Sequence, residues 1–407
     1  MNLIEEKFSR LANNNAPGQE SRQTELDWNK FLKGEKLIGV PVDFSHGDVN
    51  QSAFAPTPGA LEEFVSGFAR GSEQAYTEYR GAASLRTQVA DHLSTFTGTY
   101  LSGEEELIVT PGTQSALFLA IASTVIAEDK VAIVKPDYFA NRKLVEFIGA
   151  KVLAVGMEYL GSSEGSGIDL NGLEAAFKSG AKIFLFSNPN NPTGVVYSTT
   201  EIDRISALAN QYGATVIVDQ LYSRLLYSGV NFTHLCANQS NAKNVITIMG
   251  PSKTESLSGF RLGVAFGPRH LIDRMEKLQA IVSLRAPGYC QAVLRTWFTE
   301  PSGWLADRIT KHQSLRDDLV KILRTVSGLD VRASDAGSYL FPCLPALSVN
   351  LIDFVRILRH QAAVTVTPGT EFSPDDTNSV RVNFSQNHVA AVQAISRTVE
   401  LINRYRL

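Results

Sequence analysis

Short runs of β-branched and aromatic residues alternate with helix-length segments between residues 107 and 266 of this 407-residue chain. The alternation is typical of a mostly parallel sheet covered by helices on both faces, because parallel strands need long crossover connections. It therefore predicts an α/β fold with a three-layer α/β/α large domain. We expect strands at 107–110, 131–135, 183–187, 215–219, 245–249 and 262–266. We expect crossover helices at 114–126, 141–148 and 200–212.

The pattern changes after about residue 285, which predicts a smaller α+β C-terminal domain. Its expected elements are a long helix at 304–326, strands near Val331, Tyr339, Val364 and Val380, and a final helix from His388. We predict an N-terminal segment (1–45) packing on the small domain and the pocket, a large domain (46–284) and a small domain (285–407). Residues 16–31 and the loop around Tyr289 are expected to help shape the pocket.

Composition narrows the classes of partner. The chain has 38 basic against 41 acidic residues and a formal charge of -3, so no basic field favours nucleic acid or anionic lipid. The first residues contain acids and no apolar signal core, and the apolar stretch 117–127 is too short for a membrane span. Three distant cysteines fit a reducing compartment, and the histidines lack metal-ligand spacing. We therefore expect a cytoplasmic protein without a metal.

Two residues whose charged side chains are costly to bury lie at the ends of predicted strands. Ligands of open α/β sheets bind at these strand ends. Lys253 lies between an apolar strand and a glycine-bearing turn, where burial lowers the pKa of the amine and frees it as a nucleophile. Asp219 ends the apolar strand 215–219, where a carboxylate is costly to bury without a charged partner. A nucleophilic amine and a buried carboxylate suit a Schiff base formed with a protonated pyridine ring.

The remaining groups needed to bind such a ring are present. Gly112, Thr113 and Gln114 open a helix whose free N–H groups face an anion, although a simple capped helix is the alternative. Tyr138 could stack on a flat ring or pack in the core. Tyr222, the Asn191 amide and the guanidinium groups of Arg261 and Arg381 could bind the ring oxygen, a phosphate and a carboxylate. Together they predict a pyridoxal 5'-phosphate site.

Several longer motifs carry a resemblance. They are Tyr76-Thr-Glu-Tyr-Arg-Gly81, Asn190-Asn-Pro-Thr-Gly194, Asp219-Gln-Leu-Tyr222, Ser252-Lys253 through Arg261, and Val380-Arg-Val-Asn383. In this order they resemble the class I/II aminotransferases, the fold type I pyridoxal-phosphate enzymes that include aspartate aminotransferase. The resemblance covers about residues 35–400.

The resemblance implies roles for the ring-binding residues. Lys253 would hold the cofactor as an internal aldimine, and Asp219 would pair with the pyridine nitrogen. Asn191 and Tyr222 would bind the ring oxygen, and Tyr138 would stack on the ring. After the amino acid displaces Lys253, its amine would carry the proton as general acid and base.

The resemblance also implies a phosphate site and a substrate site. Gly112, Thr113, Gln114 and Arg261 would meet the phosphate, with Tyr76 reaching in from a second subunit of a homodimer. Arg381 would bind the α-carboxylate of the substrate, beside Gly47 and Asn191. Many relatives have Ser or Thr three residues before the lysine, where this chain has Gly250. Either Ser252 takes over this phosphate contact or the contact is missing.

The implied activity is a ping-pong transfer of an amino group from an L-amino acid to a 2-oxo acid. A lyase, or an amino acid oxidase or hydroxylase, on the same fold is the alternative, because cofactor motifs do not separate these outcomes. An effector-binding domain of a transcription regulator is disfavoured, since residues 1–45 are too short for a DNA-binding domain and are not basic. We find no motif for a second, distal carboxylate-binding arginine, so aspartate specificity is not supported.

Overall fold

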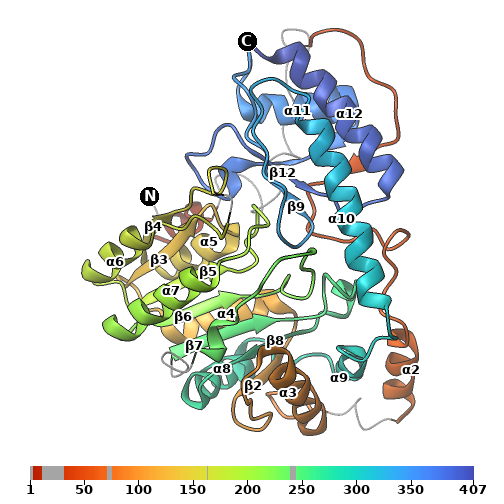
Figure 1. The fold of residues 1–407 in the computed structure, drawn as a ribbon. Helices are drawn as coiled ribbons and strands as arrows, with labels where there is room; N and C mark the ends of the chain where they lie inside the picture. The colour runs from red at the N-terminus through yellow and green to blue at the C-terminus, as the bar shows by residue number, and fades with distance from the viewer. Residues whose placement is uncertain (1–2, 12–31, 71–75, 163, 239–243) are drawn as a thin grey trace.

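The computed structural model describes residues 3–11, 32–70, 76–162, 164–238 and 244–407. Its centre is a sheet of seven strands in the order β2-β8-β7-β6-β5-β3-β4 (Figure 1). The strands are β2 (Leu107–Thr110), β3 (Lys130–Lys135), β4 (Lys151–Gly156), β5 (Ile183–Ser187), β6 (Thr215–Asp219), β7 (Val245–Met249) and β8 (Gly263–Phe266). β8 is antiparallel to β2 and β7, and the other neighbours are parallel. The predicted mostly parallel sheet is confirmed.

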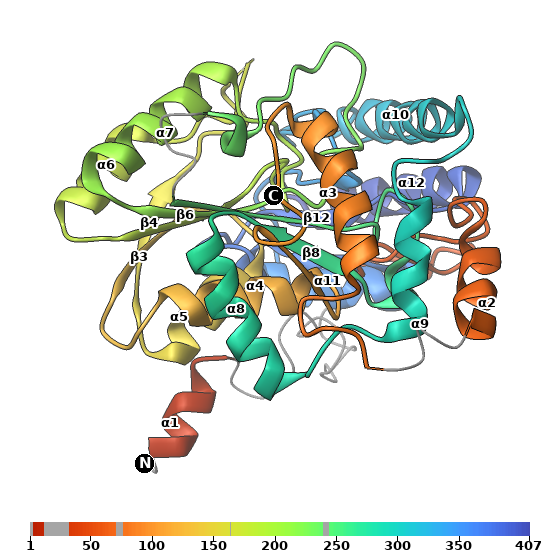
Figure 2. The ribbon, with the colours of Figure 1, turned by 90° about the horizontal axis from the view of Figure 1, so that it is seen from below.

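Helices cover both faces of this sheet (Figure 2). One face carries α4 (Thr113–Thr124), α5 (Phe139–Ile148) and α8 (Arg269–Val282), and the other carries α6 (Leu170–Lys178) and α7 (Thr199–Tyr212). Alternate side chains of β5 explain the layering, because successive residues of a strand point to opposite faces. Leu185 packs with the first set of helices, whereas Phe184 and Phe186 pack with the second.

The remaining N-terminal elements are not part of the central sheet. They are α1 (Leu3–Ser9), β1 (Val42–Asp43), α2 (Ala60–Arg70) and α3 (Ala83–Thr97). Residues 16–31 lie outside the described residues, so their contribution to a pocket stays a prediction. Further along, Leu37 N–H donates to the Gln361 carbonyl (2.7 Å), and β1 pairs with a strand of the C-terminal part.

The C-terminal part holds two small sheets and three long helices. Its elements are α9 (Gly288–Gln291), α10 (Trp304–Leu323), β9 (Tyr339–Leu340), α11 (Leu351–Ala362), β10 (Val364–Thr365), β11 (Thr367–Pro368), β12 (Val380–Asn383) and α12 (His388–Tyr405). β1 pairs with β10, and β11, β12 and β9 form the second sheet. One apolar cluster joins α10, α11 and α12 to Val42 and Phe44. The domain boundaries at residues 45 and 284 stay a prediction.

One predicted strand does not form, and the edge strand β4 was missed. Near Val331 the chain makes only a single bridge, between Asp330 and Cys343, and the Val331 side chain is buried. Residues 329–334 alternate apolar and polar side chains as a strand does, but within the described residues they find no partner for a ladder beyond that bridge. β4 was not predicted, because as an edge strand it is mostly exposed or half-buried and has no continuous buried run.

Membrane spans and metal-ligand clusters are both missing from the described residues. No helix among them is long and apolar enough to span a membrane. In the same ranges no three His, Cys, Asp or Glu side chains group as metal ligands. Cys236, Cys290 and Cys343 are free thiols and are partly buried.

Candidate active site

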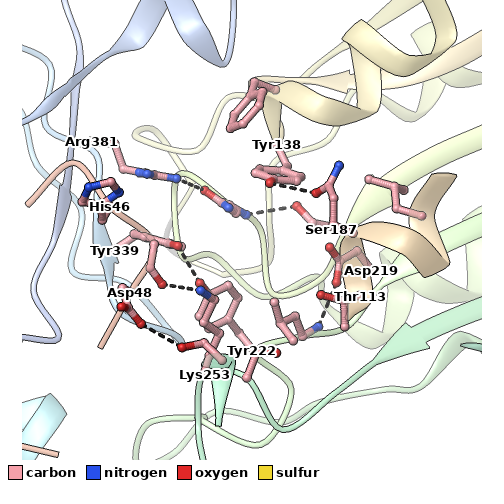
Figure 3. A pocket seen from close by; sticks show the side chains of 18 of the residues that line it. His46, Asp48, Thr113, Tyr138, Ser187, Asp219, Tyr222, Lys253, Tyr339 and Arg381 are labelled. Atoms are coloured by element: carbon pink, nitrogen blue, oxygen red, sulfur yellow. Dashed lines mark hydrogen bonds between the residues drawn. The ribbon is translucent and has the colours of Figure 1, made fainter. Parts of the chain in front are cut away.

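A cavity of about 480 Å³ lies where the carboxyl ends of β3, β5, β6 and β7 face the C-terminal part (Figure 3). Parallel strands deliver their following loops to one edge, so residues distant in sequence meet there. The predicted site residues that line it are Gly47, Thr113, Gln114, Tyr138, Asn191, Asp219, Tyr222, Ser252, Lys253, Arg261 and Arg381. Gly112 does not line the cavity itself but lies against Arg261, which does. Tyr76 does not line the cavity.

Lys253 reaches the cavity from the turn that follows β7. The turn is closed by hydrogen bonds from Ser256 N–H to the Lys253 carbonyl and from Leu257 N–H to the Pro251 carbonyl (both 3.2 Å). The Lys253 amine donates to the carbonyl of Gly47. A Cβ at Gly47 would lie 3.4 Å from this amine. A side chain at position 47 would therefore lie in contact with the amine.

Asp219 ends β6, the strand next to β7, and accepts a hydrogen bond from Leu221 N–H (3.0 Å). Burial raises the pKa of this carboxyl to about 6, while the Leu221 hydrogen bond and the charge of Lys253 oppose the rise. The raised pKa means that the cavity buries this carboxylate without giving it a close cationic partner. A protonated ring nitrogen is such a partner, so Asp219 fits the pyridine of pyridoxal phosphate.

A third part of the cavity lining comprises Tyr222, Asn191 and Arg381. Asn191 follows β5, and its amide oxygen accepts from Arg381 Nη1 (3.0 Å). Arg381 Nη2 donates to the Ser45 carbonyl (2.8 Å), and the buried Nε has no partner within the described residues. A buried guanidinium N–H without a hydrogen-bond partner favours the binding of an anion. A carboxylate fits best, because its two oxygens can accept from two guanidinium N–H groups at once.

The predicted phosphate site lies at the backbone that starts α4. Gly112 has φ 87°, and a Cβ there would lie 2.5 Å from Arg261 Nη2, so only glycine admits the guanidinium. A Cβ on Gly250 would lie 2.9 Å from Thr113 Cγ2. A side chain at this position would therefore crowd Thr113. Ser252 is also buried and lines the cavity, so its contact with a phosphate stays a prediction.

Tyr138 follows β3, and its hydroxyl donates to Gln114 Oε1 (3.0 Å). Behind it lies Asp137, whose carboxylate accepts from Tyr138 N–H (2.6 Å) and from the hydroxyl (2.6 Å) and N–H (2.9 Å) of Ser187. Ser187 Oγ in turn accepts from Asn191 N–H (3.0 Å). These bonds tie the loop after β3 to the loop after β5.

The structure also separates some predicted residues from the cavity. Tyr76 is 80% exposed and its ring packs against the Arg285 guanidinium, 4.2 Å away, outside the cavity. Tyr289 packs on Phe68 (5.3 Å between ring centroids) and does not line the cavity either. A contribution of Tyr76 from a second copy stays a prediction.

Sequence reasoning missed Asp137 and Tyr339. Asp137 stands next to Tyr138 after a predicted strand, so a polar residue at that strand end was a usable signal. Tyr339 comes from the C-terminal part, and nothing in its local sequence indicates a place in the cavity. Only the packing of the C-terminal part on the sheet brings it there.

Comparison with known proteins gives the family. The family model described as aminotransferase class I and II matches residues 41–395. The chain belongs to this family. Its sequence prediction as a class I/II aminotransferase of fold type I is therefore confirmed, and the protein is an aminotransferase.

Individual relatives agree with this assignment. A crystal structure of an aspartate aminotransferase from Rhodobacter sphaeroides 2.4.1 is 57% identical, with a TM-score of 0.95 over 99% of this chain and 100% of that one. The aspartate aminotransferase of Sulfolobus acidocaldarius is 29% identical over 82% of this chain and 84% of its own. The N-succinyldiaminopimelate aminotransferase of Mycobacterium tuberculosis is 25% identical, with a TM-score of 0.81 over 89% of this chain and 93% of that one. These names favour transamination over the lyase, oxidase and regulator alternatives.

Proposed function

We propose that this aminotransferase uses pyridoxal 5'-phosphate to move the amino group of an L-amino acid to a 2-oxo acid in a ping-pong sequence. The observation that carries the proposal is the convergence of the Lys253 amine, the Asp219 carboxylate and the Arg381 guanidinium on one cavity. When bound, the cofactor supplies an electron sink for the charge that develops at the substrate's Cα.

The cavity residues divide the cofactor between them. Asp219 would pair with the ring nitrogen, Tyr222 and Asn191 would donate to the ring oxygen, and Tyr138 would stack on the ring. The phosphate would be held by Gly112, Thr113, Gln114, Ser252 and Arg261. The start of α4 supports this, because its free N–H groups and helix dipole favour an anion.

Lys253 carries the proton of the reaction. Its amine would hold the cofactor and, when free, would accept the proton from the substrate's Cα and return it, as general base and acid. The Gly47 carbonyl supports this role. It accepts a hydrogen bond from Nζ and so holds the amine beside the predicted substrate site. Arg381 binds the substrate's α-carboxylate with its fork and so fixes Cα beside the amine.

The assembly and setting are part of the proposal. We place Tyr76 on the phosphate of a second copy, which makes the protein a homodimer with shared active sites; the exposure of Tyr76 supports this. We place the protein in the cytoplasm, in keeping with its free thiols. Nucleic acid and membranes are not expected partners. Relatives named aspartate aminotransferase make aspartate and glutamate, with their 2-oxo acids, the first substrates to test.

The visible spectrum of the protein reconstituted with pyridoxal phosphate tests the proposal. Amino acids are added singly without an oxo acid, and the expected result is loss of the yellow band with one equivalent of 2-oxo acid released. Lys253→Ala abolishes multiple turnovers, whereas Lys311→Ala, at an exposed ion pair with Asp307, leaves them unchanged. Catalytic release of ammonia from one amino acid, without an acceptor, would contradict transamination.

A further inference from the structure

Tyr339 is a buried aromatic residue that enters the cavity from the C-terminal part (Figure 3). It starts β9, which pairs with β12 in the register Asn383 to Tyr339. Arg381 lies two residues before Asn383 on the same strand, so the sheet places the Tyr339 ring close to the Arg381 guanidinium. The Tyr339 side chain is thus held between the C-terminal sheet and the strand-end loops.

The Tyr339 hydroxyl meets a second phenol. Its oxygen lies 2.5 Å from the Tyr222 oxygen, so one of the two hydroxyls donates to the other. Each phenol has only one proton to donate. If Tyr222 donates to the ring oxygen of the cofactor, it has to accept from Tyr339. Burial raises the pKa of Tyr222 well above its usual range, so Tyr222 remains a protonated donor.

The two hydroxyls therefore form a directed chain from Tyr339 through Tyr222 to the ligand. In such a chain each hydrogen bond polarises the next, which strengthens the terminal donor. A Cβ on Gly47 would lie 3.0 Å from the Tyr339 hydroxyl and 3.4 Å from the Lys253 amine. The Tyr339 hydroxyl and the Lys253 amine thus lie close to the same point beside Gly47.

The Tyr339 ring has a separate contact. The Arg381 guanidinium carbon lies 4.5 Å from the centre of the Tyr339 ring and 4.7 Å from that of Phe372. Within the described ranges Arg381 donates hydrogen bonds to an amide oxygen and a backbone carbonyl, and to no carboxylate. The two aromatic faces therefore stabilise a buried cation whose charge no carboxylate of the protein balances in these hydrogen bonds. An anionic ligand could balance it. The aromatic faces also restrict the guanidinium to one plane.

We propose that Tyr339 is a positioning residue of this aminotransferase, which orients the Tyr222 hydroxyl through its own hydroxyl and the Arg381 guanidinium through its ring. This inference rests on the proposed function, because it takes the cofactor's ring oxygen as the acceptor of Tyr222. The two contacts predict two separable effects of substitution.

A double-mutant cycle on the reconstituted protein tests the hydroxyl. The measurement is the pH midpoint of the change in the visible band, which follows the proton on the nitrogen joining Lys253 to the cofactor. A donor at the ring oxygen favours the deprotonated nitrogen, so Tyr339→Phe raises the midpoint by roughly half a unit to one unit. In a Tyr222→Phe background the same substitution leaves the midpoint unchanged, because the chain is already broken.

The ring is tested by comparing Tyr339→Phe with Tyr339→Leu. The phenylalanine variant keeps the aromatic face and the KM for the best donor amino acid of the wild-type protein. The leucine variant releases the guanidinium and raises this KM by about tenfold, as the loss of a desolvated cation–π contact implies. Tyr405→Phe is the matched control, because its buried hydroxyl bonds Gln361 (3.1 Å) far from the cavity, and it changes neither quantity.

Several results would overturn the inference. They are an unchanged midpoint in Tyr339→Phe, equal shifts in both backgrounds, and equal KM values for the phenylalanine and leucine variants. Failure of the proposed function is distinguishable, because it is seen in the wild-type protein as the absence of a lysine-dependent visible band. The cycle compares variants only after that band has been observed.

Discussion

Replacing Asp219 by asparagine tests whether the buried Asp219 charge lowers the free energy of unfolding of the cofactor-free protein. Burial raises the pKa of Asp219 from 3.8 to about 6. The difference of about 2.2 units corresponds to ~3 kcal/mol at 1.36 kcal/mol per unit. Because the folded pKa is raised, this carboxyl destabilises the folded state as the pH rises from about 4 to above 6. The asparagine side chain keeps an oxygen to accept from Leu221 N–H and carries no charge.

We therefore expect Asp219→Asn to stabilise the cofactor-free protein by up to ~3 kcal/mol at pH 8. By the same linkage the gain falls to roughly half at pH 5, where the native carboxyl is mostly protonated. With an unfolding entropy of about 2.1 cal/mol/K per residue over 407 residues, ~3 kcal/mol raises Tm by about 3.5 °C.

The assay is thermal unfolding of both cofactor-free proteins at pH 8 and pH 5, at one protein concentration, because the Tm of any protein that self-associates depends on concentration. The variant should at the same time bind pyridoxal phosphate less tightly, since the ring nitrogen loses its counter-charge. Equal Tm values at pH 8, or a gain as large at pH 5 as at pH 8, would refute the reasoning. Stabilisation with loss of function is the trade-off expected where an active site holds an uncompensated charge.

Two further predictions concern the support of the site. Gly263→Ala places a Cβ 2.4 Å from the Thr113 nitrogen, so the start of α4 has to move; we expect the dissociation constant of pyridoxal phosphate, measured by absorbance titration, to rise at least about tenfold. Arg224→Met removes the cation that pairs with the buried carboxylates of Glu255 and Glu300. We expect a loss of about 3–5 kcal/mol in unfolding free energy, measured by urea denaturation and smaller at low pH, where the carboxyls take up protons.

Each of these predictions has a control. Gly156→Ala adds a Cβ that meets nothing within 4 Å, and it should leave the dissociation constant unchanged. Arg204→Met removes an exposed ion pair with Glu174 and should cost no more than about 1 kcal/mol. Unchanged cofactor affinity in Gly263→Ala, or equal destabilisation by the two arginine variants, would contradict the interpretation of these contacts.

Local sequence predicted the parts of this protein whose structure is decided locally. Six of the seven strands of the central sheet were predictable because each is an apolar run bounded by polar or glycine residues, and buried strands require such runs. Lys253, Asp219 and Asn191 were predictable as a group, because polar residues that directly follow buried strands converge on one edge of a parallel sheet. The edge strand β4 escaped because an exposed edge imposes no continuous apolar pattern.

The tertiary structure decided what depends on contacts between distant segments. In the sequence Gly250 is only a departure from the family pattern, whereas the structure shows that Thr113 packs closely against it. Tyr339 gains its place only when β9 pairs with β12 and the C-terminal part covers the cavity. Sequence periodicity reports which face of an element is buried, but it carries no information on which partner covers that face. The chain's own sequence therefore determined the sheet and the chemistry at its edge, and long-range packing determined how those groups are oriented.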